Sequence, residues 1–128
     1  MTQSFVPMND LESMLVRAKN GQVPVSDLIR TLLDSDVVLP SGSEVLADGT
    51  GFEPLLFSKE KVQMVACFTD KSRIGEYVIM TPYCLVMKGK DFLRGIPSGH
   101  GVVVNPGQEV GFDISPDGVG KVLNDFPR

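Results

Sequence analysis

A run of three valines, preceded by glycine and followed by a turn signal, constrains the fold of this chain more than any other stretch. Val102, Val103 and Val104 follow Gly101, and the run ends in Asn-Pro-Gly at residues 105–107. β-Branched side chains fit a pleated sheet, whereas proline cannot continue a ladder of backbone hydrogen bonds. The stretch therefore predicts a buried central strand that stops in a tight turn.

Apolar runs elsewhere in the chain predict the other strands of the sheet. Residues 62–68 are apolar at nearly every position, which is typical of a strand covered on both faces. Residues 110–114 follow the turn closely enough to pair antiparallel with the valine strand. Further strands are predicted at 37–39, 44–47, 55–57 and 83–87. Pro40 is expected to end the first of these, and Asp48-Gly49 to form a hairpin turn between the second and the third.

Periodic apolar residues predict helices beside the strands. Helical spacing over 11–18 and over 25–33 predicts two N-terminal helices that pack together at one side or edge of the sheet. Asn9 is expected to cap the first of them, and Ser26 or a neighbouring residue the second. Three further helices are predicted to begin after Asp70, at Lys88 and after Ser115.

These elements indicate a single compact domain of the α/β (α+β) class, with a mixed sheet and helices packed on it. A chain of 128 residues is an ordinary size for one domain. Hydrophobic residues make up 42% and charged residues 22%, which is typical of a soluble globular protein. Residues 1–8 lack any period and are expected to form a flexible N-terminal arm, so the domain is assigned to 9–128.

Charge and hydropathy narrow the classes of partner. A formal net charge of −4 makes nucleic acid and an anionic membrane surface poor partners. The apolar runs are much shorter than the roughly 18 to 20 residues that a membrane-spanning helix needs, and acidic residues stand where a signal peptide carries basic ones. We therefore expect a cytoplasmic protein with a protein partner, and the oligomeric state stays open.

Three residues are candidates for a ligand site, and each also has a structural interpretation. His100, the only histidine, lies in a loop rich in glycine and serine that could form an anion-binding concavity. This loop lacks the lysine of a phosphate-binding loop. Asp70 and Asn105 stand at predicted strand ends, where aspartate and asparagine commonly cap helices or form turns. Asp70 could also converge there with Asp113 and Asp117.

The two cysteines are the remaining candidates for catalytic or metal-binding groups. Cys67 and Cys84 lie within apolar runs, where a reduced thiol behaves as a small buried hydrophobe, so we expect both to be unreactive. One histidine and two distant cysteines do not supply the ligands of a zinc site. We therefore expect no catalytic residue, no metal and no cofactor.

The order of two motifs resembles a known family. Phe-Thr-Asp at 68–70, followed by Gly-Val-Val-Val-Asn-Pro-Gly at 101–107, is similar to the SseB protein N-terminal domain family, named for enhanced serine sensitivity in bacteria. A leucine-rich helix that leads into residues 37–40 also resembles that family. The resemblance covers most of the chain, from about residue 11 to 126. It implies a bacterial cytoplasmic protein with a compact α/β domain and without established enzymatic chemistry.

The family resemblance also implies a role. Longer members continue into a C-terminal domain, whereas this sequence ends at Arg128. A stand-alone domain of this kind is expected to be a non-enzymatic protein-interaction module, serving as a secretion-system accessory or as an immunity protein. The alternative is a small enzyme or small-ligand binder that uses the loop around His100 together with Asp70 and Asn105.

Overall fold

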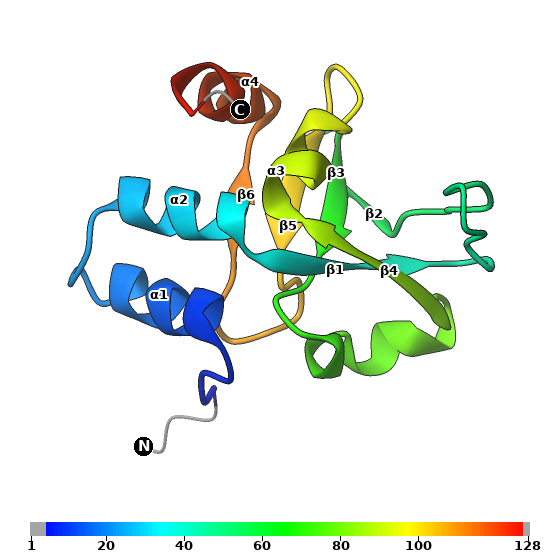
Figure 1. Cartoon of the computed structure of the whole chain (residues 1–128), viewed down its shortest axis with the longest axis horizontal. Helices are drawn as coiled ribbons and strands as arrows, with labels where there is room; N and C mark the ends of the chain where they lie inside the picture. The colour runs from blue at the N-terminus through cyan, green and yellow to red at the C-terminus, as the bar shows by residue number, and fades with distance from the viewer. Residues whose placement is uncertain (1–4, 127–128) are drawn as a thin grey trace.

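The computed structural model describes residues 5–126, and within them four α-helices and two β-sheets form an α+β fold (Figure 1). The larger sheet has the order β2-β3-β5-β6, with β2 at Leu56–Lys59, β3 at Val62–Cys67, β5 at Gly101–Val104 and β6 at Phe112–Ile114. The smaller sheet pairs β1 (Asp36–Ser41) with β4 (Tyr83–Lys88). The α-helices are α1 (Asp10–Lys19), α2 (Val25–Asp34), α3 (Gly89–Arg94) and α4 (Pro116–Asp125). Two short 3₁₀ helices, η1 (Lys71–Arg73) and η2 (Gly75–Ile79), follow β3.

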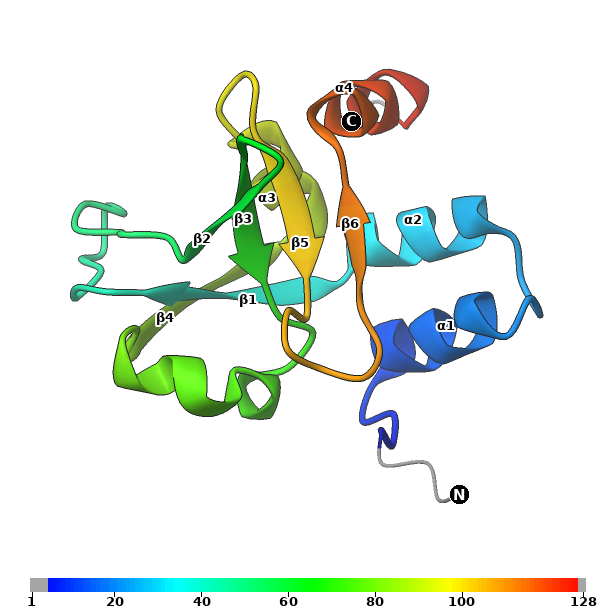
Figure 2. The same ribbon diagram turned by 180° about the vertical axis from the view of Figure 1, so that it is seen from behind.

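The valine strand β5 lies inside the larger sheet, as its sequence predicts. β3 runs parallel to it, with Val65 opposite Val102, and β6 runs antiparallel on its other side, with Ile114 opposite Val102. Figure 2 shows β3, β5 and β6 side by side, with α3 behind them. Both neighbours are the strands predicted from the apolar runs at 62–68 and 110–114, although β6 is shorter than its run.

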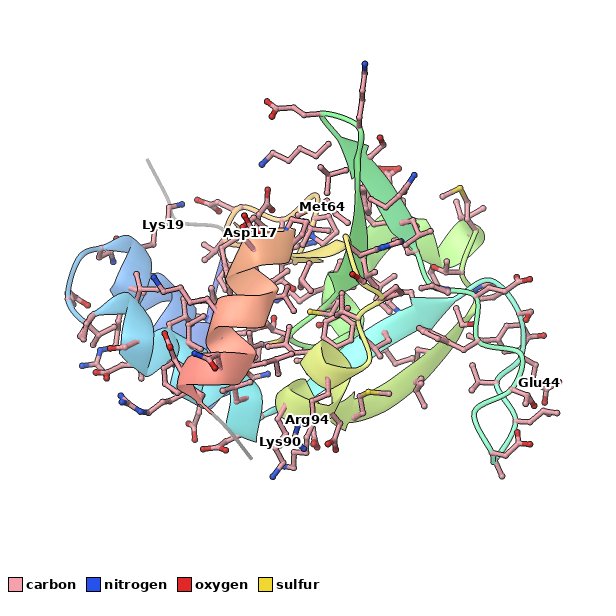
Figure 3. The ribbon with its side chains drawn as sticks, turned by 90° about the horizontal axis from the view of Figure 1, so that it is seen from above. Lys19, Glu44, Met64, Lys90, Arg94 and Asp117 are labelled. Atoms are coloured by element: carbon pink, nitrogen blue, oxygen red, sulfur yellow. The ribbon has the colours of Figure 1, made fainter. Side chains whose placement is uncertain are left out.

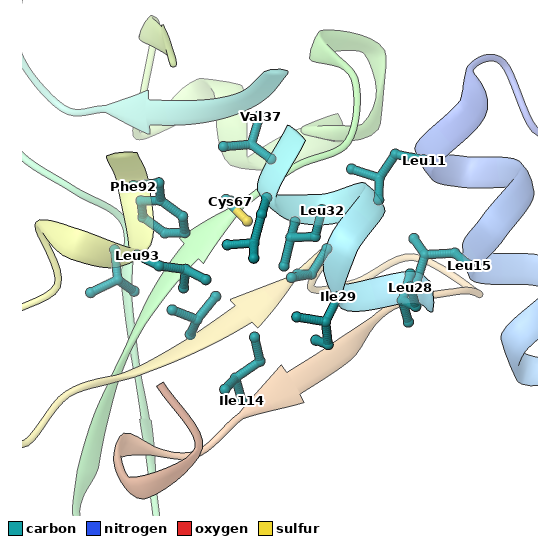
Figure 4. Packing of buried hydrophobic residues seen from close by; sticks show 14 of the residues in the cluster. Leu11, Leu15, Leu28, Ile29, Leu32, Val37, Cys67, Phe92, Leu93 and Ile114 are labelled. Atoms are coloured by element: carbon teal, nitrogen blue, oxygen red, sulfur yellow. The ribbon is translucent and has the colours of Figure 1, made fainter. Parts of the chain in front are cut away.

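Successive side chains of the central strands point into two separate cores. Val65 and Val102 face the larger core, where all four α-helices bury apolar side chains (Figure 4). Ala66 and Phe68 face a smaller core on the opposite side, which is closed by Ile74 between η1 and η2. Both faces of β3 are therefore covered. This confirms the prediction made from the nearly continuous apolar run at 62–68.

The helices begin and end largely where capping chemistry predicts. The Asn9 side chain accepts a hydrogen bond from the Glu12 N–H at 2.9 Å, and the Ser115 hydroxyl accepts one from the Gly118 N–H at 3.0 Å. Ser26 does not cap α2, because the helix begins one residue earlier, after Pro24, which makes no side-chain capping bond. None of the helices within residues 5–126 is long and apolar enough to span a membrane.

Pro40 does not end β1, which continues to Ser41. The Val38 N–H and C=O both bond to Phe68, at 2.8 Å each, so Val38 turns its backbone polar groups away from β4. Backbone direction repeats every two residues in a strand, and Pro40 therefore faces the same way as Val38. Its missing N–H costs the β1–β4 ladder no hydrogen bond, which is why a proline is tolerated there.

The strand predicted at residues 44–47 is absent, and this segment belongs to a loop between β1 and β2. The Asp48-Gly49 turn does form, since the Gly49 N–H donates to the Leu46 carbonyl and the Leu46 N–H donates to that of Thr50. The residues before the turn are largely exposed, so no core face holds them in a sheet. The turn therefore closes a loop instead of a hairpin.

Part of the N-terminal segment is packed against the domain. Phe5 is buried in the larger core, and the guanidinium carbon of Arg73 lies 3.9 Å from the centre of its ring. The Val6 carbonyl accepts a hydrogen bond from the same guanidinium at 2.6 Å. The flexible arm expected over residues 1–8 therefore does not include Phe5, and residues 1–4 lie outside the described residues.

Candidate functional site

The two sequence motifs meet in a network of buried polar side chains. Thr69 follows β3 and Asn105 follows β5, and both lie at the same end of the sheet because these strands are parallel. The Asn105 side-chain oxygen accepts a hydrogen bond from the Thr69 N–H at 2.9 Å. Its amide nitrogen donates to the Thr69 hydroxyl at 2.9 Å and to the Val110 carbonyl at 3.3 Å. Asn105 thus joins the Phe-Thr-Asp and Asn-Pro-Gly segments, which is a structural role.

Glu12 of α1 completes this network, although it is fully buried. Its carboxylate accepts hydrogen bonds from Arg73 at 2.8 and 3.0 Å, from the Thr69 hydroxyl at 2.6 Å and from the Met8 N–H at 3.0 Å. Burial acts to raise the pKa of Glu12, but these hydrogen bonds outweigh it and hold the pKa below the usual glutamate value. Within residues 5–126 every buried side-chain polar atom has a partner, so the network presents no free group to a ligand.

Asp70 adjoins the network but acts as a cap. Its carboxylate accepts hydrogen bonds from the Ser72 N–H at 3.0 Å and from the Ser72 hydroxyl at 2.7 Å. The bond from the backbone N–H, followed by that from the hydroxyl, lowers the pKa of Asp70. The capping interpretation of Asp70 is therefore the one that the structure supports.

The three aspartates considered for a carboxylate cluster do not converge. Asp113 forms an ion pair with Lys59 on the exposed side of the sheet. Asp117 lies in the first turn of α4, which follows the end of β6 that is farther from Asp70. Among the residues that the structure describes, no group of three or more histidine, cysteine, aspartate or glutamate side chains could hold a metal ion.

His100 lies at the other end of β5 from Asn105, so the structure separates these two candidates. It lines an apolar groove of about 470 Å³ whose walls come from both sheets, from α3 with the loop after it, and from the loop before β2. Asp91 is the other titratable side chain along this groove. His100 Nδ1 lies 3.3 Å from the Ser98 carbonyl of its own loop. The groove was not predicted, because its walls come from segments far apart in the sequence.

The two cysteines differ in their surroundings. Both thiols are free, but Cys67 is fully buried and Cys84 is half-buried. Burial raises the pKa of the Cys67 thiol well above its usual value. Cys84 lines a second groove of about 260 Å³ between β4 and η2. The prediction of a buried thiol is confirmed for Cys67 and wrong for Cys84, because β4 has a neighbouring strand on one side only.

Three consecutive apolar residues are exposed where the chain passes from η2 toward β4. Val78, Ile79 and Met80 are 49%, 82% and 63% exposed, and we call them the η2 surface. Ile74 and Tyr77 pack against the smaller core, and the three residues after Tyr77 lie outside it. This surface was not predicted. In the sequence it corresponds to three consecutive apolar residues, which one buried helix face cannot cover.

Acidic side chains border the η2 surface. Glu76 is an exposed residue of η2 itself. The Glu53 carboxylate lies beside Gly42, at the point of the loop where the Met80 carbonyl also approaches. The loop at residues 42–55 carries three acidic residues and no lysine or arginine. The η2 surface is therefore apolar at its centre, with Glu53 and Glu76 along part of its border and Lys71 in the groove that Val78 lines.

Comparison with known proteins identifies one related family. The family model described as the SseB protein N-terminal domain matches residues 11–121. This range includes both sequence motifs and the buried network of Glu12, Thr69, Arg73 and Asn105 that connects them. No curated protein and no solved structure matches the chain significantly.

Proposed function

The chain belongs to the SseB protein N-terminal domain family, and on that basis we propose that it is a non-enzymatic module that binds a protein partner through the η2 surface. The exposure of Val78, Ile79 and Met80 carries this proposal, since Ile79 is 82% exposed. Single exposed apolar residues are ordinary, but a contiguous group is typical of an interaction site. The polar groups at the two motifs are meanwhile engaged in holding the fold together.

The border of the η2 surface indicates the chemistry of the partner. Glu53 and Glu76 place negative charge beside the apolar centre, and the whole chain carries a net charge of −4. A partner that presents apolar side chains with lysine or arginine around them fits this pattern. Such a partner would be a secretion-system component or a toxin if the module serves, in the bacterial cytoplasm, as an accessory or immunity protein.

The test combines capture of the partner with a matched pair of variants. The purified protein is used to capture partners from a lysate of the cells that make it, and these are identified by mass spectrometry. Affinity for the purified partner is then measured with Ile79→Ser and with Val25→Ser. Val25 is also a strongly exposed apolar residue, at 68%, but it lies on α2.

We expect Ile79→Ser to weaken binding about tenfold or more, as truncation of a central apolar anchor does, and Val25→Ser to leave it unchanged. His100→Ala and Cys84→Ser should also leave it unchanged. Equal affinities of the wild type and Ile79→Ser would reject the η2 surface as the binding site.

A second candidate function is binding of a small ligand in the groove beside His100. The observation in its favour is the groove volume of about 470 Å³, with apolar walls and only two titratable side chains. Ligand pockets commonly have this size and composition. If this candidate is right, a screen of apolar compounds will find one whose binding is lost in His100→Ala and kept in Ile79→Ser.

A further inference from the structure

The outer edge of β4 is open. β4 pairs with β1 on one side and with no other strand of the described chain. In Figure 3, β4 is the yellow-green strand below β1, and no other strand lies alongside its outer edge. The edge consists of backbone groups of β4, whereas the η2 surface consists of the side chains of residues 78–80. The two adjoin at the groove that Val78 shares with Tyr83 and Cys84.

The direction of the backbone groups shows which residues of β4 face this open edge. Val38 is opposite Val86, and both backbone groups of Val38 bond to Phe68 on the far side of β1. The Val38–Val86 pair is therefore a pair without mutual hydrogen bonds, and the Val86 N–H and C=O point outward. Cys84, two residues away, points its N–H and C=O the same way. No hydrogen bond within residues 5–126 occupies these groups.

β4 lacks the features that normally keep an open edge from pairing. Between Pro82 and Lys88 its sequence is Tyr-Cys-Leu-Val-Met, without charge, proline or glycine. Natural edge strands usually carry such residues, a bulge or a covering loop. The Val86 side chain is 54% exposed. The outward backbone groups are therefore available to a further strand.

We propose that β4 pairs antiparallel with β4 of a second copy of the chain, about a two-fold axis at Val86. The two β1–β4 sheets then become one continuous sheet across the dimer. In this register Val86 faces itself, and Lys88 faces Cys84 of the second copy. The two Lys88 side chains stay apart, and Pro82, which has no N–H, lies outside the paired residues. A two-fold interface of this kind is the commonest one in homo-oligomers.

The distribution of charge along the smaller sheet agrees with antiparallel pairing. Glu44, in the acidic loop, and Lys90 lie at opposite ends of the β1–β4 ribbon (Figure 3). Lys90 has no ion pair within the described residues, whereas Lys88 pairs with Asp36 at 3.3 Å. Antiparallel pairing turns Lys90 of each copy toward the acidic end of the other. Parallel pairing would instead bring the acidic loops of the two copies together.

The experiment measures molecular mass by sedimentation velocity and light scattering, from micromolar to near-millimolar concentration. The wild type should change from monomer to dimer with concentration. Val86→Lys and Val86→Glu should each raise the dimer dissociation constant about tenfold or more, because like charges then face each other at the axis. An equimolar mixture of the two variants should restore a dimer. Val25→Lys, at an exposed position on α2, should dimerise as the wild type does.

Two checks keep the test decisive. Circular dichroism and thermal unfolding establish that each variant is folded. In the wild type, the Val86 amide should exchange its hydrogen more slowly as the dimer forms, which requires no variant. A wild type that stays monomeric overturns the proposal, and so does a dimer that both charged variants leave intact. Failure of the folded variants to pair in the mixture, or an unchanged Val86 exchange rate, overturns it as well.

Discussion

Glu12 holds a negative charge inside the protein, and Arg73 and Thr69 make that possible. An ion pair this deeply buried gains little over an apolar packing of the same volume, because both ions lose their hydration. Loss of one partner is different, since the other charge then stays behind without compensation. The network is better understood as a device that locks α1 to the turn after β3 and to the turn after β5.

We expect Glu12→Gln to lower the free energy of unfolding by about 3 kcal/mol. Arg73 would keep its charge while its side chain stays only 14% exposed. Urea unfolding at neutral pH measures this loss. Glu76→Gln, at an exposed glutamate on η2, is the matched control and should stay within about 0.5 kcal/mol of the wild type. Equal effects of both substitutions would contradict a special role for Glu12.

The lowered pKa of Glu12 also makes stability depend on pH. A carboxyl group with a lower pKa in the folded than in the unfolded state contributes stability above the unfolded value, about 4.3 for glutamate. This contribution is lost as pH falls through the folded pKa. Asp70, whose pKa is also lowered, acts in the same direction. Between about pH 5 and pH 3, the free energy of unfolding of the wild type should therefore fall more steeply than that of Glu12→Gln. Urea unfolding at several pH values in this range measures both.

The two thiols should react at very different rates. Cys67 is fully buried and its pKa is raised, so its thiolate is both scarce and inaccessible. Cys84 lies at an open groove. With a thiol reagent at neutral pH, we expect one cysteine per chain to react in the native state and the second only in denaturant. Cys84→Ser should abolish the native reaction, and a reaction that persists in this variant would place Cys67 at the surface.

At the scale of secondary structure, the phase of the β1–β4 ladder decides which residues tolerate proline. Pro40 already occupies a position of β1 whose backbone groups point away from β4. By the same alternation, the Leu85 N–H points toward Leu39, whereas that of Val86 points outward. Identical substitutions at neighbouring residues should therefore have unequal effects.

We expect Leu85→Pro to cost about 3 kcal/mol or more, because it removes a ladder hydrogen bond, and Val86→Pro to cost no more than about 1 kcal/mol. Urea unfolding of dilute protein measures both without a contribution from dimerisation. The opposite order of stabilities would show that the backbone direction assigned to β4 is wrong.

At the scale of the whole molecule, charge should control how fast a partner binds. The net charge of −4 attracts a basic partner over roughly the Debye length, about 8 Å at physiological salt and about 3 Å at 1 M. We expect the association rate constant for the captured partner to fall with rising salt while the dissociation rate changes little. Stopped-flow measurements at two salt concentrations test this. An association rate independent of salt would exclude electrostatic attraction as a contribution.

Local chemistry in the sequence determined most of the secondary structure. The valine run, its apolar neighbours and the caps at Asn9 and Ser115 depend on residues within a few positions of each other. Their predictions are confirmed because propensity, periodicity and capping act over that range. The order of the two motifs was also sufficient to indicate the family.

The tertiary structure alone decided how the candidate residues are used. Glu12 and Arg73 are 61 residues apart, and only folding brings them together. The parallel course of β3 and β5 places Asn105 beside Thr69 and leaves His100 at the other end. The single neighbour of β4 exposes Cys84, and the inward turn of Ile74 and Tyr77 leaves the η2 surface outside. These outcomes depend on which elements become neighbours, because burial and hydrogen-bond partners belong to the packed chain and not to any one segment of it.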